Sequence, residues 1–176
     1  MKTTYKILSL VLLTSILFSC KKYDDYTKDF DITTVYFASQ KPLRTIVAYD
    51  NMTFKVGVAL AGKRENTVSE TAEFVIDPSL LTTVTGANAF TLLPASYYTL
   101  SNNSTFTIAP GSFIGDVTVT LNKAAFTADP LAKNNTYAIP LRITSSSADS
   151  VLANKNYTIL VVKYISPYHG TYYHKG

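Results

Sequence analysis

Tryptophan is absent from this sequence, cysteine occurs once, and histidine occurs twice. A single cysteine excludes an internal disulfide and any metal site built from several thiolates. His169 and His174 are five residues apart near the end of the chain, so HExxH zinc spacing is absent. A serine triad would have to take its base from these two histidines, and no G-x-S-x-G elbow accompanies them. We therefore predict no metal, no cofactor and no catalytic triad.

The acidic residues give no sign of a glycosidase pair either. Glycoside hydrolysis needs two carboxylates that face each other across the sugar. The twelve acidic residues lie in the N-terminal tether, beside turns, or at odd spacing around one strand, as Glu70 and Glu73 do. Basic residues are scattered, which argues against nucleic acid binding. The expected protein is not an enzyme.

The first residues have the layout of an export signal. Lys2 and Lys6 precede an apolar run of 12 residues, 7–18. A transmembrane helix needs about 20 apolar residues, whereas the core of a signal peptide has roughly 7–15. A buried core helix is the alternative. We predict a signal peptide over residues 1–19, cleaved between Ser19 and Cys20.

The residues around the cleavage point resemble two known signals. Leu17-Phe18-Ser19-Cys20 resembles a bacterial lipobox, although Phe18 stands where a small residue is usual. That resemblance implies acylation of Cys20 and anchoring in lipid, since two or three acyl chains hold stably where one does not. Lys22, Asp24 and Asp25 resemble the export signal of Bacteroidetes surface lipoproteins. The expected location is the outer membrane, on the cell surface, with residues 20–31 as a flexible tether.

From residue 32 the sequence alternates between apolar and polar positions with period 2, which is typical of half-buried strands. Eight or nine strands are expected, with candidates over residues 32–38, 43–49, 53–60, 72–76, 97–100, 104–111, 115–122, 137–144 and 157–165. Residues 157–165 are apolar on both faces, as in a central strand, while Pro140 indicates an edge strand or a bulge. Asp77 and Gly86 are expected to begin and end one short helix.

These strands predict an all-β fold, an immunoglobulin-like Greek-key β-sandwich over residues 32–166. Residues 167–176 read as a linker or the start of a further domain. Several segments, in order, resemble the N-terminal immunoglobulin-like domain, formerly of unknown function, of Bacteroidetes surface lipoproteins associated with polysaccharide utilisation: LLPASYYTL, FTIAPGSFIGDVTVTL, YAIPLRITSSSA and ISPYHGTYYHKG. The resemblance covers about residues 20–176 and brings no catalytic residues with it.

Three functions follow as hypotheses. The first is a non-enzymatic stalk or docking module in a glycan-acquisition system, whose partners are outer-membrane lipid and glycan-uptake proteins. The second is a carbohydrate-binding module that uses exposed tyrosines, with Tyr97 and Tyr98 as glycan contacts. The third is an accessory domain of a glycosidase whose catalytic domain lies outside this chain. Separately, Asp149-Ser150-Val151 fits a Bacteroidetes O-glycosylation pattern in a loop-like stretch, which makes Ser150 a predicted modification site.

Overall fold

The computed structural model describes residues 29–39, 43–49, 51–166, 168 and 170–171. The chain divides into two units, Met1–Asp31 and Ile32–Gly176, and the fold described below belongs to the second. Within the described residues, no helix has the length and apolar character that a membrane span requires.

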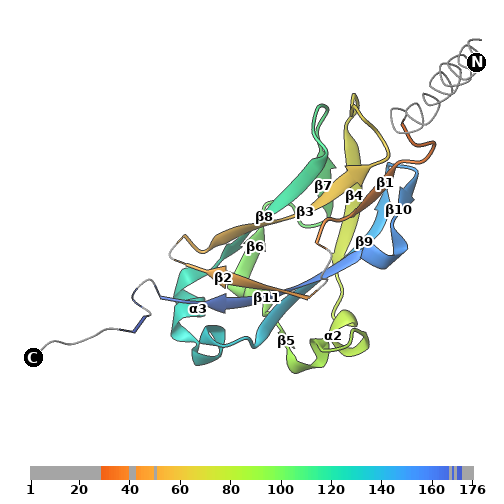
Figure 1. Ribbon diagram of the computed structural model, residues 1–176. Coiled ribbons are helices and arrows are strands. Elements are labelled where there is room, and N and C mark those ends of the chain that lie inside the picture. Colours follow the sequence, from red (N-terminus) through yellow and green to blue (C-terminus); the bar gives the residue numbers. More distant parts are fainter. Residues whose placement is uncertain (1–28, 40–42, 50, 167, 169, 172–176) are drawn as a thin grey trace, which may run out of the picture. The chain divides into compact units, whose positions relative to one another are not determined.

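The second unit is an all-β sandwich of two sheets, as predicted (Figure 1). The first sheet has the order β10-β1-β3-β8-β6, with bounds Ser150–Val151, Thr34–Phe37, Thr53–Ala61, Ile114–Leu121 and Tyr98–Leu100. The second has the order β2-β11-β9-β4-β7, with bounds Leu43–Ala48, Tyr157–Tyr164, Tyr137–Ser146, Glu70–Ile76 and Thr105–Ile108. A two-residue strand, β5 (Thr91–Leu92), adds to β9. Short helices fill the connections: α2 (Leu80–Thr83), α3 (Lys123–Ala128), η2 (Ala87–Ala89), η3 (Ala95–Tyr97), η4 (Pro130–Lys133) and η5 (Ala153–Lys155).

The alternation in the sequence places the core between the two sheets. In β3 and β8 every second residue from Val56 and Val117 is buried, while the residues between them are half-buried or exposed. The second sheet supplies Phe74, Ile139 and Leu160 to the same cluster. Burial of such side chains contributes about 1.5–3 kcal/mol each, so the period-2 pattern is the main reason that the two sheets pack. β11 is a central strand between β2 and β9, as predicted.

Pro140 does not mark an edge strand, because β9 pairs on both sides. The carbonyl of Ala138 accepts a hydrogen bond from Leu93 N, and that of Pro140 accepts one from Asp77 N. The backbone groups of Ala138 and Pro140 therefore point toward β5 and β4, and not toward β11. Pro140 has no N–H to return this bond to Asp77, whose carbonyl accepts a hydrogen bond from Leu80 N instead, and the pairing of β4 with β9 ends here. The bulge expected at Pro140 is also not found there; β9 has a bulge at Thr144 instead, where the register with β4 shifts.

The segment between β4 and β6 covers the outer face of the second sheet. Leu80 and Leu81 of α2 pack there with Ala138, Ile159 and Val161 in a second apolar cluster. The expected helix forms but is shorter than residues 77–86. Asp77 does not cap it; its carboxylate instead accepts hydrogen bonds from the backbone and hydroxyl of Ser79 in a preceding turn. Gly86 lies after the helix in the left-handed conformation, with φ +83°.

The chain enters and leaves the sandwich at opposite ends. β1 begins beside β10, where Thr34 pairs with Ser150, and only η5 separates β10 from the start of β11. β11 then runs eight residues, about 26 Å at 3.3 Å per residue, to Tyr164. In Figure 1 it runs from the side of β10 toward α3. We call the end at Thr34 the N-terminal end of the sandwich and the end at Tyr164 its C-terminal end.

Candidate functional site

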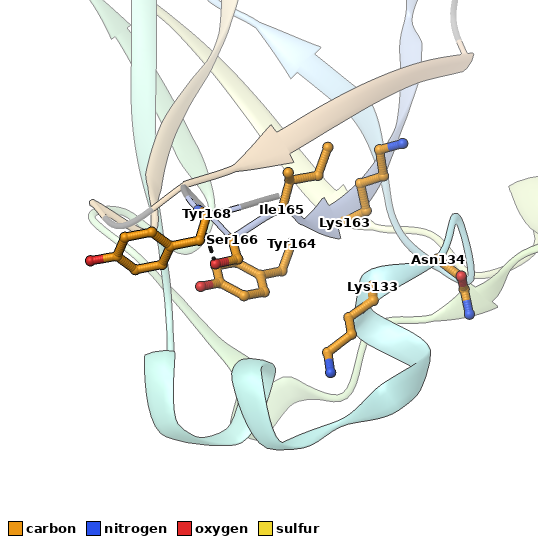
Figure 2. Close-up of a pocket in the computed structure, with 7 residues that line it drawn as sticks. All are labelled: Lys133, Asn134, Lys163, Tyr164, Ile165, Ser166 and Tyr168. Atoms are coloured by element: carbon orange, nitrogen blue, oxygen red, sulfur yellow. Dashed lines mark hydrogen bonds between the residues drawn. The ribbon is translucent and has the colours of Figure 1, made fainter. Parts of the chain in front are cut away.

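A pocket of about 540 Å³ lies at the C-terminal end of the sandwich. Its seven lining residues come from the end of η4 and from the end of β11 with the chain that follows: Lys133, Asn134, Lys163, Tyr164, Ile165, Ser166 and Tyr168. Figure 2 shows the two tyrosine rings on one flank, Lys163 and Asn134 on the other, and Lys133 between them. This volume is within the range of small-molecule sites.

Asp129 sets the position of Lys133 through η4. One of its carboxylate oxygens accepts a hydrogen bond from Leu131 N at 2.8 Å, which caps the helix. The other accepts from the hydroxyl of Tyr137 at 2.7 Å and from that of Tyr97 at 3.2 Å. These bonds tie the segment after β8 to the start of β9, so Lys133 is held beside the end of β11.

The hydrogen bonds of Asp129 with Tyr97 and Tyr137 shift the pKa values of all three side chains. The Tyr137 hydroxyl and then Leu131 N–H hold the pKa of Asp129 below its usual value of 3.8. The hydrogen bond from the Tyr137 hydroxyl to the Asp129 carboxylate, together with burial, raises the pKa of Tyr137 to about 12. The cluster therefore holds an ionised carboxylate and two neutral phenols at neutral pH. Because each group already has a hydrogen-bond partner, the cluster is structural.

The tyrosines predicted as glycan contacts point to different places. Tyr97 packs edge-on against Phe126 and Tyr137, with its ring partly in the core. Tyr98 lines a second cavity, of about 530 Å³, between β6 and the end of β4, with Ile76, Ala95, Thr99, Leu100 and Asn103. Burial raises the pKa of the Tyr98 hydroxyl. Tyr98 thus faces a cavity, whereas the ring of Tyr97 packs against other aromatic rings.

The predicted modification site lies at the N-terminal end of the sandwich, in the short strand β10 and not in a loop. Asp149 accepts hydrogen bonds from Thr33 N at 2.8 Å and from Thr33 Oγ1 at 2.6 Å. The hydroxyls of Ser150 and Thr34 share a hydrogen bond of 2.9 Å. Gly62 makes room for the chain just before β1, because a Cβ there would collide with the carbonyl of Ile32. Glycosylation of Ser150 stays a prediction.

Glu70 and Asp149 form a carboxylate cluster at this end that sequence spacing did not reveal. Glu70 is only 6% exposed. It accepts hydrogen bonds from Ser147 Oγ at 2.5 Å and from Lys63 Nζ at 2.9 Å, and these hold its pKa below 4.5. The contacts of Asp149 with Thr33 likewise lower the pKa of that carboxyl. A glycosidase acid needs a raised pKa, so this cluster is suited to structure and not to acid catalysis.

Other predicted residues lie outside the described part of the chain. They are the cleavage and lipidation residues Ser19 and Cys20, the export-signal residues Lys22, Asp24 and Asp25, and the histidines His169 and His174. In the ranges that the structure does describe, no group of three or more metal-ligating side chains comes together.

The residues of the C-terminal pocket were only partly visible in the sequence. Tyr164 stands out as a tyrosine near the end of the last predicted strand. Lys133 and Asn134 gave no signal, because they reach β11 only through the fold of α3 and η4. Tyr36, another strand tyrosine, instead meets the ammonium of Lys155, 5.2 Å from its ring centre.

Comparison with known proteins places the chain in a family of N-terminal domains. A family model described as a "-like, N-terminal domain" matches residues 26–150. This match spans well over half of the sequence, so the chain belongs to that family. No curated protein matches the chain.

A solved structure supports the resemblance to a Bacteroidetes domain. It is a structural-genomics protein of unknown function from Bacteroides ovatus, solved at 2.40 Å resolution. The two chains share 28% sequence identity with a TM-score of 0.68. The match covers 81% of this chain and 55% of the other, so this chain spans just over half the length of that relative.

Proposed function

We propose that this protein is a non-enzymatic, lipid-anchored spacer on the surface of the outer membrane, which presents the part that follows it in a glycan-acquisition system. The observation that carries this proposal is that the chain enters the sandwich at Thr34 and leaves it at Tyr164, at opposite ends of the sandwich (Figure 1). A domain with this geometry adds its own length to the distance between whatever precedes and whatever follows it. The family description as an N-terminal domain agrees with such a place in a longer chain.

The strand pairing also suits a spacer that carries load. β2, near the start of the sandwich, pairs in parallel with the last strand, β11, over six register positions. Force applied where the chain enters and leaves the sandwich pulls β2 toward the N-terminal end and β11 toward the C-terminal end. Both strands are then loaded along their axes, so the hydrogen bonds between them must fail together and not one after another.

We infer further that the sandwich is a variant of the immunoglobulin-like Greek key. Support comes from the first two strands, since β1 pairs in one sheet and β2 in the other, and from the parallel pairing of β2 with the last strand. One departure is that β6, in the first sheet, precedes β7, in the second. An experimental structure that contradicts this strand order would overturn the inference.

Single-molecule pulling tests the spacer. In a Cys20→Ser chain, thiols introduced by Ile32→Cys and Tyr168→Cys apply force across opposite ends of the sandwich. The matched control uses Tyr49→Cys and Tyr168→Cys, which lie after the parallel ends of β2 and β11 and so peel one strand from the other. All three positions are well exposed, at 60%, 55% and 82%. We expect the first pair to require the larger unfolding force, and equal forces would contradict a load-bearing design.

Separate experiments test the anchor and the absence of catalysis. Cys20→Ser should abolish metabolic labelling by palmitate and release the protein from the membrane fraction. Protease added to intact cells should digest the wild-type protein if it is displayed outside. Hydrolysis of chromogenic glycosides by the purified chain would contradict the non-enzymatic assignment and favour a glycosidase.

A second function, carbohydrate binding, is favoured by the tyrosine-lined cavities. Sugar-binding sites combine apolar ring platforms with a few polar groups. Tyr98 lines one such cavity, and Tyr164 and Tyr168 line the other. Titration of the chain with a glycan panel, with Tyr98→Ala and Tyr168→Ala alongside, tests this function and identifies the cavity. Binding that neither substitution weakens would exclude both cavities.

A further inference from the structure

We propose that the pocket at the C-terminal end of the sandwich binds an acidic saccharide, one that carries a carboxylate or a sulfate group. This inference rests on the second proposed function, carbohydrate binding, and is independent of the spacer. Stacking of a sugar on tyrosine rings does not by itself distinguish acidic from neutral sugars, and the inference adds this distinction.

The charge of the pocket points to an anion. Two of its seven lining residues are lysines and none is acidic. Elsewhere, Lys55 and Lys63 are paired with Asp116 and Glu70. Within the described residues, neither Lys133 nor Lys163 forms a salt bridge, so neither ammonium group is paired with a carboxylate there.

The carboxylate nearest to Lys133 in sequence, that of Asp129, is not among the residues that line the pocket. Asp129 begins η4, but both of its oxygens already accept hydrogen bonds, from Tyr97, Tyr137 and Leu131 N. These donors hold the carboxylate in a hydrogen-bonded cluster, apart from the seven residues that line the pocket. An anion that enters the pocket therefore meets a lining that contains two lysines, whose ammonium groups lie at opposite margins in Figure 2, and no acidic residue.

The remaining lining residues fit a sugar ring better than a small inorganic anion. The ring of Tyr164 is fixed because it packs against the core, and Tyr168 presents an 82% exposed side chain beside the same pocket. Aromatic rings offer apolar faces to the C–H groups of a sugar. Asn134 adds an amide that both donates to and accepts from hydroxyl groups. A pocket of about 540 Å³ accommodates more than a single small ion.

Calorimetric titration with three matched trisaccharides tests the inference. The probes are a galacturonic acid trisaccharide, a sulfated galactose trisaccharide and the neutral galactose trisaccharide, added to the whole chain carrying Cys20→Ser. The test variant is Lys133→Gln with Lys163→Gln. Its control, Lys55→Gln with Lys155→Gln, makes the same charge change on β3 and η5, away from the pocket.

We expect at least one acidic trisaccharide to bind about tenfold more tightly than the neutral one, and the test variant to lose about that factor while the control does not. Added salt should reduce the preference. Tyr168→Ala should weaken acidic and neutral sugars alike. The anionic probe that binds better identifies carboxylate or sulfate as the preferred group.

Each contrary result has a distinct meaning. Equal binding of acidic and neutral sugars overturns the acidic preference and leaves carbohydrate binding in place. Acidic binding that survives the test variant places the site elsewhere and overturns the assignment of this pocket. No binding of any probe overturns both. Thermal unfolding of the test variant checks folding, and because Lys133 is exposed and Lys163 half-buried, we expect it to match wild type.

Discussion

The lysines at the two ends of the sandwich have different surroundings. At the N-terminal end Glu70 accepts hydrogen bonds from Lys63 and Ser147. Asp149 there accepts one from Thr33, just before β1. At the C-terminal end Lys133 and Lys163 line an open pocket. The difference separates groups that hold the chain in place from groups with charge left to offer a ligand. Charged residues of the first kind are expected to affect stability, and those of the second kind binding.

Removal of the core that both ends share should have the largest effect. Phe106 is fully buried and contacts the rings of Phe37 and Phe74, from the two sheets. Phe106→Ala should lower the free energy of unfolding by about 3–5 kcal/mol, because it removes a large side chain and leaves a cavity. Urea denaturation measures this loss. A loss below about 1 kcal/mol would show that the two sheets do not form one core.

A substitution at the N-terminal end should come next. Glu70→Ala leaves Ser147 and Lys63 without their shared acceptor, and we expect a loss of about 1–3 kcal/mol in the same denaturation experiment. Glu73→Ala on the same strand is the control, since Glu73 is exposed. If both substitutions have equal effects, the N-terminal end has no special role in stability.

The pH dependence of stability should differ between the two ends. The contacts of Glu70 and Asp149 lower the pKa of each, so their contribution is present above the usual values of 4.5 and 3.8 and is lost as the pH falls further. Tyr137 is the reverse case: its pKa rises from 10.0 to about 12, so its contribution is present below pH 10 and is lost as the pH rises through 12. Melting temperatures from pH 2.5 to 12 should therefore show an acid loss that Glu70→Gln reduces and an alkaline loss that Tyr137→Phe reduces. If Glu70→Gln reduced the alkaline loss and Tyr137→Phe the acid loss, the proposed difference between the two ends would be refuted.

The smallest effect on stability is expected at the C-terminal pocket. Lys133→Gln and Lys163→Gln should each change the free energy of unfolding by no more than about 0.5 kcal/mol, because neither lysine lies in a salt bridge within the described residues. Urea denaturation of these variants beside Glu70→Ala measures the contrast between the ends. A loss as large as that of Glu70→Ala would mean that the pocket lysines hold the fold.

The sequence predicted the long strands well, and it failed where tertiary contacts decide the structure. Alternation at Val56, Val117 and Phe106 identified β3, β8 and β7, because one buried face fixes a period of 2. The two-residue strands β5 and β10 are too short to show any period, and they form because β9 and β1 offer them partners. Helix α3 was missed, although Asn122 caps it with a hydrogen bond to Ala125 N.

The candidate site was less predictable than the fold, for the same reason. Tyr97 and Tyr98 are neighbours in sequence, yet one packs on Phe126 and the other lines a cavity. Lys133 and Lys163 are separated by 30 positions in sequence, and they line one pocket because η4 is held by tertiary contacts, among them the burial of Ala132 in the core and the hydrogen bonds of Asp129 with Tyr97 and Tyr137. No local pattern records such a contact.

The separation of Thr34 from Tyr164 also limits how this domain can be combined with others. Domains whose termini lie close together tolerate circular permutation and insertion into a loop of another protein. Here a linker that joined the two termini would have to cross the length of β11, so both rearrangements are disfavoured. The fold instead suits end-to-end concatenation, in which each added copy lengthens the protein by one domain. The order of the domains along the sequence is then also their order in space.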